Sequence, residues 1–285
     1  MDDYLIGVLS NIGVVSFVAL SAYLLLLTTA LWGWPLALAL AWGAASGAAA
    51  AVLLGIPTLR LHGLYFSIAT LAFAEMVRIL FELFRYQVEI DGELVGPNGA
   101  EGFRAIRYIF DHNIDAVQFL LLIYVVLAAT LLGFFVLERS RTGVVFRMIG
   151  EDETLAGLQG ISVARHKVLA AGIAGALAGV GGGLYAHLTT YVEPRVFDVM
   201  LGVHSLAYGL IGGLGTALGP LLGVMIDIGL LESIRPLAGY RMVIFGGIVA
   251  LLLIVRPRGL LDERLVHRIA RMLVRSRPAR TDGRG

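Results

Sequence analysis

The sequence predicts an all-α integral membrane protein, a polytopic helical bundle of about eight spans. Of the 285 residues, 58% are hydrophobic and 15% are charged, whereas soluble domains are about 45–50% apolar and about 25% charged. The apolar residues form long runs that do not alternate with polar residues, as they would in the strands of a membrane barrel. Helices are therefore expected, because a helix satisfies its own backbone hydrogen bonds in lipid.

Eight apolar runs are the candidate spans. They cover residues 5–27, 35–56, 63–84, 116–137, 168–188, 203–219, 220–234 and 240–256. The first run is too long for a signal peptide and has no basic segment before it, so we expect a mature span. Segment 203–234 is broken by glycine, which predicts either two short helices or a re-entrant hairpin.

Arginine-rich loops predict the orientation of the chain in its membrane. Residues 138–167 and the tail after residue 256 are basic and are expected in the cytoplasm. Loop 85–115 carries three arginines against six acidic residues, so we expect it in the periplasm. The prediction is a transmembrane domain over residues 1–256 and a basic cytoplasmic tail over residues 257–285, with both termini in the cytoplasm.

The tail has an amphipathic pattern of its own. Its leucine and isoleucine residues recur every four positions between residues 261 and 273, and arginines follow on an adjoining face. Such a helix can lie on the membrane with its arginines toward anionic lipid. A solubilising tail that fixes the topology is the interpretation that the charge run favours.

Catalysis within this chain is not expected. The single lysine, Lys167, follows Arg165 and His166, so it cannot complete a glycine-rich phosphate-binding loop. There are no cysteines, and the six histidines are scattered without metal-ligand spacing. We therefore expect no catalytic residue, no cofactor, no metal and no nucleic-acid partner, and any ATP hydrolysis must occur in another subunit.

The stretch from Tyr208 to Pro220 is a poor continuous helix, because an interior glycine costs about 1 kcal/mol and a proline about 3 kcal/mol relative to alanine. A broken helix at membrane depth is tolerated where protein or a water-filled cavity surrounds it. Transporters place substrate routes at such breaks. Candidate residues of a translocation path are Gly212, Gly213, Gly215, Gly219 and Pro220.

Two further path candidates are ionisable groups inside apolar runs. Glu75 lies three residues before Arg78, on the same helix face, and a mutual ion pair is the favoured interpretation. Asp227 either bonds a neighbouring backbone or lines a path. Buried charges in membranes are paired or face a cavity, so both carboxylates remain candidates.

Glycines at four-residue spacing also predict helix packing. Gly175, Gly179 and Gly183 fall on one helix face, where small residues let two backbones approach closely. Tight packing is the favoured role of this set.

Residues 138–167 form an amphipathic segment of mixed charge. An apolar face made by Val144, Val145, Met148 and Ile149 is followed by acidic residues 151–153, which suit the N-terminus of a second short helix, and Gly160 suits its end. An apolar face in a cytoplasmic loop indicates a docking surface for another protein. A solvated loop is the alternative.

Five stretches together resemble a known family. They are Leu59–Arg78, Gly96–Gly99, Arg139–Ile161, Ala176–His187 and Gly212–Pro220. In their order and spacing they resemble the permease subunits of ATP-binding-cassette importers for branched-chain amino acids, and in particular the larger of the two related permeases. The family's glycine-histidine element after the first helix has no counterpart near Thr28–Pro35.

The resemblance implies an importer with a second homologous permease, two ATPase subunits that bind ATP and magnesium, and a periplasmic binding protein. It implies that Gly212–Pro220 lies at the translocation path and that the Gly96–Gly99 turn is on the binding-protein side. The residues of the ATPase-coupling loop would be Glu151, Glu153, Ala156 and Gly160.

The functional hypothesis is therefore a permease that moves branched-chain amino acids inward by alternating access, with urea and short amides as other candidate solutes. The alternative is an ion-coupled secondary transporter of a small solute, which would need an ionisable relay near the midplane. A membrane scaffold is a weaker alternative because it would give the glycine break no purpose, and a membrane enzyme is weaker because the chain has no catalytic constellation.

Overall fold

The computed structural model describes residues 28, 34–58, 64–90, 93–104, 114–213, 216, 218–233, 240–256 and 259–260. The first predicted span, Gly215 and the tail beyond Leu260 lie outside these residues, as does most of the Thr28–Pro35 stretch. The chain divides into two compact units, residues 1–204 and 205–285.

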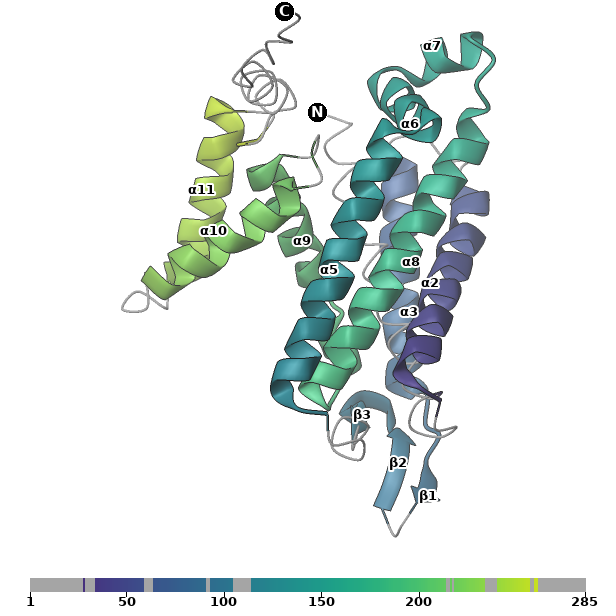
Figure 1. The fold of residues 1–285 in the computed structure, drawn as a ribbon, viewed down its shortest axis with the longest axis vertical. Helices are drawn as coiled ribbons and strands as arrows, with labels where there is room; N and C mark the ends of the chain where they lie inside the picture. Colours follow the sequence, from purple (N-terminus) through teal and green to yellow (C-terminus); the bar gives the residue numbers. More distant parts are fainter. Residues whose placement is uncertain are drawn as a thin grey trace, which may run out of the picture. The chain divides into compact units, whose positions relative to one another are not determined.

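The first unit contains the long helices. They are α2 (Leu36–Thr58), α3 (Leu64–Leu83), α5 (Ala116–Arg139) and α8 (Val163–Thr189) (Figure 1). These bounds confirm helices at four of the predicted runs. Among the described residues, three segments are long and apolar enough to cross a membrane, namely Leu36–Ile56, Ala116–Arg139 and Val163–Thr189. The total of eight spans stays a prediction.

The tightest helix pair in this unit is α2 with α8. A Cβ placed on Gly175 would lie 2.4 Å from the carbonyl oxygen of Gly47 and 2.6 Å from the Cβ of Ala51. Gly179 and Gly183 are buried on the same face of α8. Small residues thus bring the two backbones together, and the packing role predicted for this glycine set is confirmed at Gly175.

A small antiparallel sheet follows α3, in the order β1 (Val88–Ile90), β2 (Glu93–Pro97) and β3 (Phe103–Arg104), with Glu89 opposite Leu94 and Gly96 opposite Arg104. A turn of 3-10 helix, η1 (Gly99–Glu101), joins β2 to β3. The search for apolar runs did not predict these strands, because they have only two to five residues each.

The sheet is fastened to the segment after α8. The N–H of Phe103 donates to the carbonyl of Val192 at 2.7 Å, and the N–H of Val192 donates back at 3.0 Å. Both side chains are fully buried. The sheet lies at one end of the long helices, and the short helices after α5 lie at the other (Figure 1). This is the arrangement that opposite sides of a membrane would require, and the sidedness itself stays a prediction.

The second unit holds most of α9 (Val199–Gly212), with α10 (Gly219–Ser233) and α11 (Arg241–Val255). Of the two forms predicted for segment 203–234, the structure has two short helices. The first of them, α9, ends at Gly212 and not at the predicted residue 219. The reason is that Gly213 adopts φ +113°, which a right-handed α-helix does not allow. At 14 and 15 residues, α9 and α10 are about 21 and 22 Å long, shorter than a bilayer core of about 30 Å.

The close contact at Gly175 between α2 and α8 predicts that two alanine substitutions on α8 differ in their effect on stability. Gly175→Ala forces the backbones apart and should lower stability by about 1–3 kcal/mol, as overpacking does. Gly181→Ala, on the same helix with open space around it, should be neutral or stabilising, since alanine is the better helix former. Thermal unfolding in detergent measures both, and equal effects would contradict the close contact.

Candidate functional site

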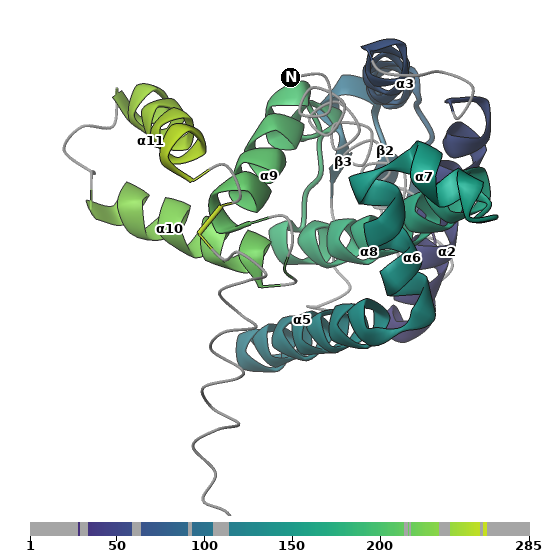
Figure 2. The ribbon, with the colours of Figure 1, turned by 90° about the horizontal axis from the view of Figure 1, so that it is seen from above.

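Two short helices join the end of α5 to the start of α8, as both views show (Figure 1 and Figure 2). They are α6 (Arg141–Glu151) and α7 (Glu153–Leu158). The Ser140 side chain caps α6 by accepting from the N–H of Gly143 at 3.2 Å, and Asp152 caps α7 by accepting from the N–H of Leu155 at 2.9 Å. Such caps satisfy otherwise unpaired donors at a helix start. We call residues 140–162 the elbow.

The elbow is folded tightly onto α5. Gly143 is buried, and a Cβ there would lie 2.2 Å from the carbonyl oxygen of Leu137, so only glycine fits. The Arg147 guanidinium donates to the carbonyl of Glu138 at 3.0 Å. These contacts fix the angle between α5 and α6.

The elbow is also attached to α8. The ring of Phe146 meets the ring of His166 edge-on, with centroids 6.2 Å apart. The Lys167 ammonium lies 2.5 Å from a carboxylate oxygen of Glu153. The elbow therefore connects two long helices as a folded element and is more than a solvated loop.

The four predicted coupling residues all lie on the elbow, but in different surroundings. Glu151 is exposed at the end of α6, whereas Ala156 is 2% exposed and packs inside the chain. Glu153 is paired with Lys167. Gly160 has φ +83° with open space around it, as expected for the turn that ends α7.

Sequence reasoning missed the two most exposed apolar side chains of α7. Leu155 is 55% exposed and Leu158 is 81% exposed. They stand three residues apart and so share a helix face. The predicted apolar face lay on α6, where Ile149 is buried and Val144 is 47% exposed. A search of α7 for leucines at helical spacing would have found the outward pair.

The glycine break in the second unit is a tight backbone joint. A Cβ on Gly212 would lie 1.6 Å from the carbonyl oxygen of Gly219, and one on Gly223 would lie 2.0 Å from the carbonyl oxygen of Tyr208. Gly259, at φ +78°, packs against Gly213. Of the predicted path residues here, Gly212, Gly213 and Gly219 are buried and Pro220 is exposed. These contacts give the glycines a packing role, and their place on a path stays a prediction.

Asp227 has a partner across this joint. The hydroxyl of Tyr208 on α9 donates to the Asp227 carboxylate on α10 at 2.9 Å. Asp227 is 6% exposed, and a buried polar group of this kind needs such a bond. The ring of Tyr208 also meets Phe245 of α11 edge-on, with centroids 6.1 Å apart. Tyr208 thus ties the three helices of this unit together.

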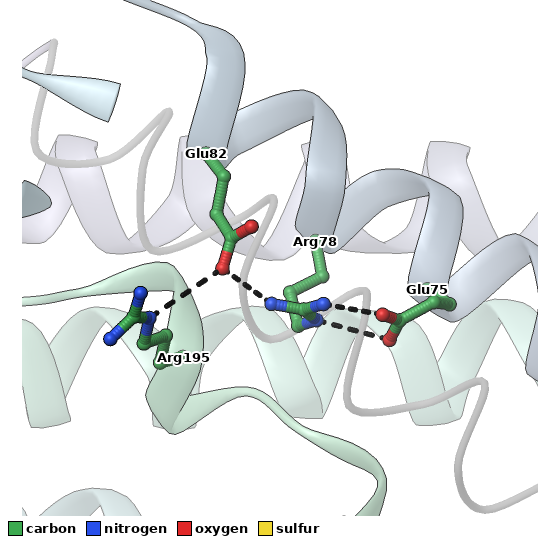
Figure 3. Close-up of polar contacts among 4 residues, drawn as sticks. All are labelled: Glu75, Arg78, Glu82 and Arg195. Atoms are coloured by element: carbon green, nitrogen blue, oxygen red, sulfur yellow. Dashed lines mark hydrogen bonds and ion pairs between the residues drawn. The ribbon is translucent and has the colours of Figure 1, made fainter. Parts of the chain in front are cut away.

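Glu75 belongs to a line of alternating charges along α3 (Figure 3). Arg78 bonds both carboxylate oxygens of Glu75, at 3.0 Å through Nε, and Glu82 at 2.5 Å through Nη1. Glu82 also lies 3.9 Å from Arg195, which follows α8. The favoured pairing of Glu75 with Arg78 is confirmed. The Glu75 side chain remains 41% exposed, and a charge within a membrane span faces water or protein.

Within the described ranges, no group of three or more histidine, cysteine, aspartate or glutamate residues is placed to hold a metal ion. The features that these residues present are ion pairs, closely packed glycines and exposed leucines. Transporters place substrate routes at breaks of the kind seen between α9 and α10, so the class that these features favour is that of solute permeases.

The chain belongs to the family described as the branched-chain amino acid transport system permease component, whose profile matches residues 4–256. Two relatives are the high-affinity branched-chain amino acid transport system permease proteins LivM of Salmonella typhimurium and Escherichia coli. Each is 32% identical over 237 residues, which cover 75% of this chain and 54% of the relative. The chain thus spans about half the length of these relatives. No solved structure matches it.

The exposed carboxylate of Glu75 predicts a wet face on α3. The chain has no cysteine, so an introduced thiol is its only one. Glu75→Cys should react with a charged, membrane-impermeant thiol reagent, because its face meets water. The neighbouring Met76→Cys, at a side chain 56% exposed on the adjoining apolar face, should stay unreactive in membranes. Equal labelling of the two variants would contradict the assignment of Glu75 to an aqueous path.

Proposed function

We propose that this chain is a transmembrane permease subunit of an ATP-driven importer that moves branched-chain amino acids into the cytoplasm. The observation that carries the proposal is the elbow, a folded element at one end of the helix bundle in a chain of the permease family. Because it contacts both α5 and α8, the elbow would transmit a movement of a partner subunit to these two long helices.

ATP would be bound with magnesium by two partner ATPase subunits, because this chain has no lysine in a glycine-rich phosphate-binding loop,. Closure of the ATPases would push the elbow and tilt the long helices, which opens the path inward by alternating access. Elbow and tail would be cytoplasmic, with both termini, in a bacterial inner membrane.

The remaining partners follow from the same proposal. A second, homologous permease would complete the path, and a periplasmic binding protein would deliver the solute on the side of the small sheet and the Gly96–Gly99 turn. The binding protein selects the solute before it arrives, so the path needs only moderate polarity. Branched-chain amino acids are favoured by the names of the relatives, and urea or short amides are the other candidates.

The joint between α9 and α10 is one candidate for the path, and the charged face of α3 is a separate candidate. Gly212, Gly213, Gly215, Gly219 and Pro220 would let the joint bend, and Glu75 would face water. Asp227 would hold the joint closed through Tyr208, at 2.9 Å, rather than carry an ion. This role leaves little support for ion coupling.

The ATPase contact should fall on Leu155 and Leu158, since these side chains point away from the chain while Ala156 and Glu153 are engaged within it. The double variant Leu155→Ser/Leu158→Ser should lose most of the co-purifying ATPase, because a few side chains buried at the centre of an interface carry most of its binding energy. Quantitative mass spectrometry of the complex purified in mild detergent measures this loss.

Leu94→Ser is the matched control, because Leu94 is 61% exposed but lies on β2 at the opposite end of the bundle. It should leave the ATPase bound. A wild-type chain that is recovered without any ATPase, even after crosslinking, would contradict the importer proposal. Full ATPase recovery with the double variant would move the contact away from α7.

A further inference from the structure

The chain's single lysine, Lys167, forms an ion pair with Glu153, one of the predicted coupling residues. Glu153 is the first residue of α7, and Lys167 lies near the start of α8. The ammonium and the carboxylate are 2.5 Å apart, and the two side chains are 38% and 52% exposed. The pair therefore bridges the two helices across the turn at residues 159–162.

That turn is a weak connection without the pair. Gly160 has φ +83° and nothing within 4 Å of the position where a Cβ would be. The N–H of Ile161 donates to the carbonyl of Ala156 at 3.2 Å, which closes the turn but does not fix the direction of α7. A push on α7 could bend the chain at Gly160 instead of moving α8.

The charges on either side of the turn are complementary. Acidic residues 151–153 gather at the start of α7, and Arg165 and Lys167 stand at the start of α8, with His166 between them against Phe146. Of these groups, Glu153 and Lys167 are the ones joined by an ion pair in the structure. The attraction between Glu153 and Lys167 favours one orientation of α7 against α8.

The pair does little for the stability of the elbow itself. Exposed ion pairs contribute little to folding, and the caps at Ser140 and Asp152 and the packing of Gly143 hold the elbow without it. Its effect is on the direction of α7. Since α8 packs on α2 through Gly175 and Gly47, movement that reaches α8 is shared by both helices.

We infer that Lys167 is a positioning residue for energy coupling: it holds Glu153, so that displacement of α7 by a partner ATPase moves α8 together with α2 and is not lost in bending at Gly160. This inference rests on the proposed function. It reassigns Glu153 from a direct contact with the partner to a contact within the chain.

The test uses the complete importer in proteoliposomes and measures solute imported per ATP hydrolysed. Lys167→Glu should lower this ratio by about two- to fivefold, the range that loss of an exposed pair allows, with an unchanged unfolding midpoint. Lys167→Arg should keep the ratio, and the charge swap Lys167→Glu/Glu153→Lys should restore it. A structural role alone would not produce rescue by the swap.

Arg165→Glu is the matched control, since it reverses a charge two residues away at an exposed position and should leave the ratio near that of the wild type. Lys167→Gln replaces Lys167→Glu if the latter fails to fold, and should also lower the ratio. A wild-type ratio in a folded Lys167 variant, or no recovery in the swap, overturns the inference. Absence of ATP-dependent uptake by the wild type would instead overturn the proposed function.

Discussion

Close contact between helix backbones, permitted by glycine, is the constraint on which this structure depends. Helices in lipid gain no hydrophobic energy from pairing, so they associate by packing and by hydrogen bonds. The same device recurs in three places: Gly175 against Gly47 between α2 and α8, Gly143 against Leu137 where the elbow folds onto α5, and Gly212 against Gly219 at the joint of the second unit. In each, a single methyl group would collide with a carbonyl oxygen of the neighbouring segment or turn. Any residue larger than glycine at these positions would push the neighbouring backbone segments apart.

Several charged side chains form ion pairs or hydrogen bonds within the chain. Arg78 is shared by Glu75 and Glu82, Asp227 accepts from Tyr208, and Lys167 holds Glu153. An isolated charge in a membrane is costly, and the contacts of Glu75 and Asp227 reduce that cost. They also weaken the case for an ion-coupled transporter, since the two carboxylates on which that alternative depended are both engaged. On the elbow, Leu155 and Leu158 are exposed apolar side chains that a partner could bury.

The sequence predicted the helices well and the contacts less well. Long apolar runs located α2, α3, α5 and α8 because lipid leaves few alternatives to a helix, and the glycines between Tyr208 and Pro220 predicted the break between α9 and α10. The pairing of Glu75 with Arg78 followed from helical spacing alone. The strands after α3 could not be predicted from apolar runs, because each has only two to five residues. The bond between Phe103 and Val192 was also hidden, because these residues lie far apart in the chain. The direction of α7 could not be predicted either, since it depends on which side of the helix meets α8, and the sequence does not show that Lys167 pairs with Glu153.

The central claim is that ATP hydrolysed by partner subunits drives solute through a path of which this chain forms part. It is tested most directly by reconstituting the purified complex in proteoliposomes and following uptake of labelled leucine with ATP on the cytoplasmic side, with and without proton and sodium gradients. The account predicts uptake that requires ATP and the binding protein and persists when both gradients are collapsed. Uptake that follows a gradient and ignores ATP would contradict it.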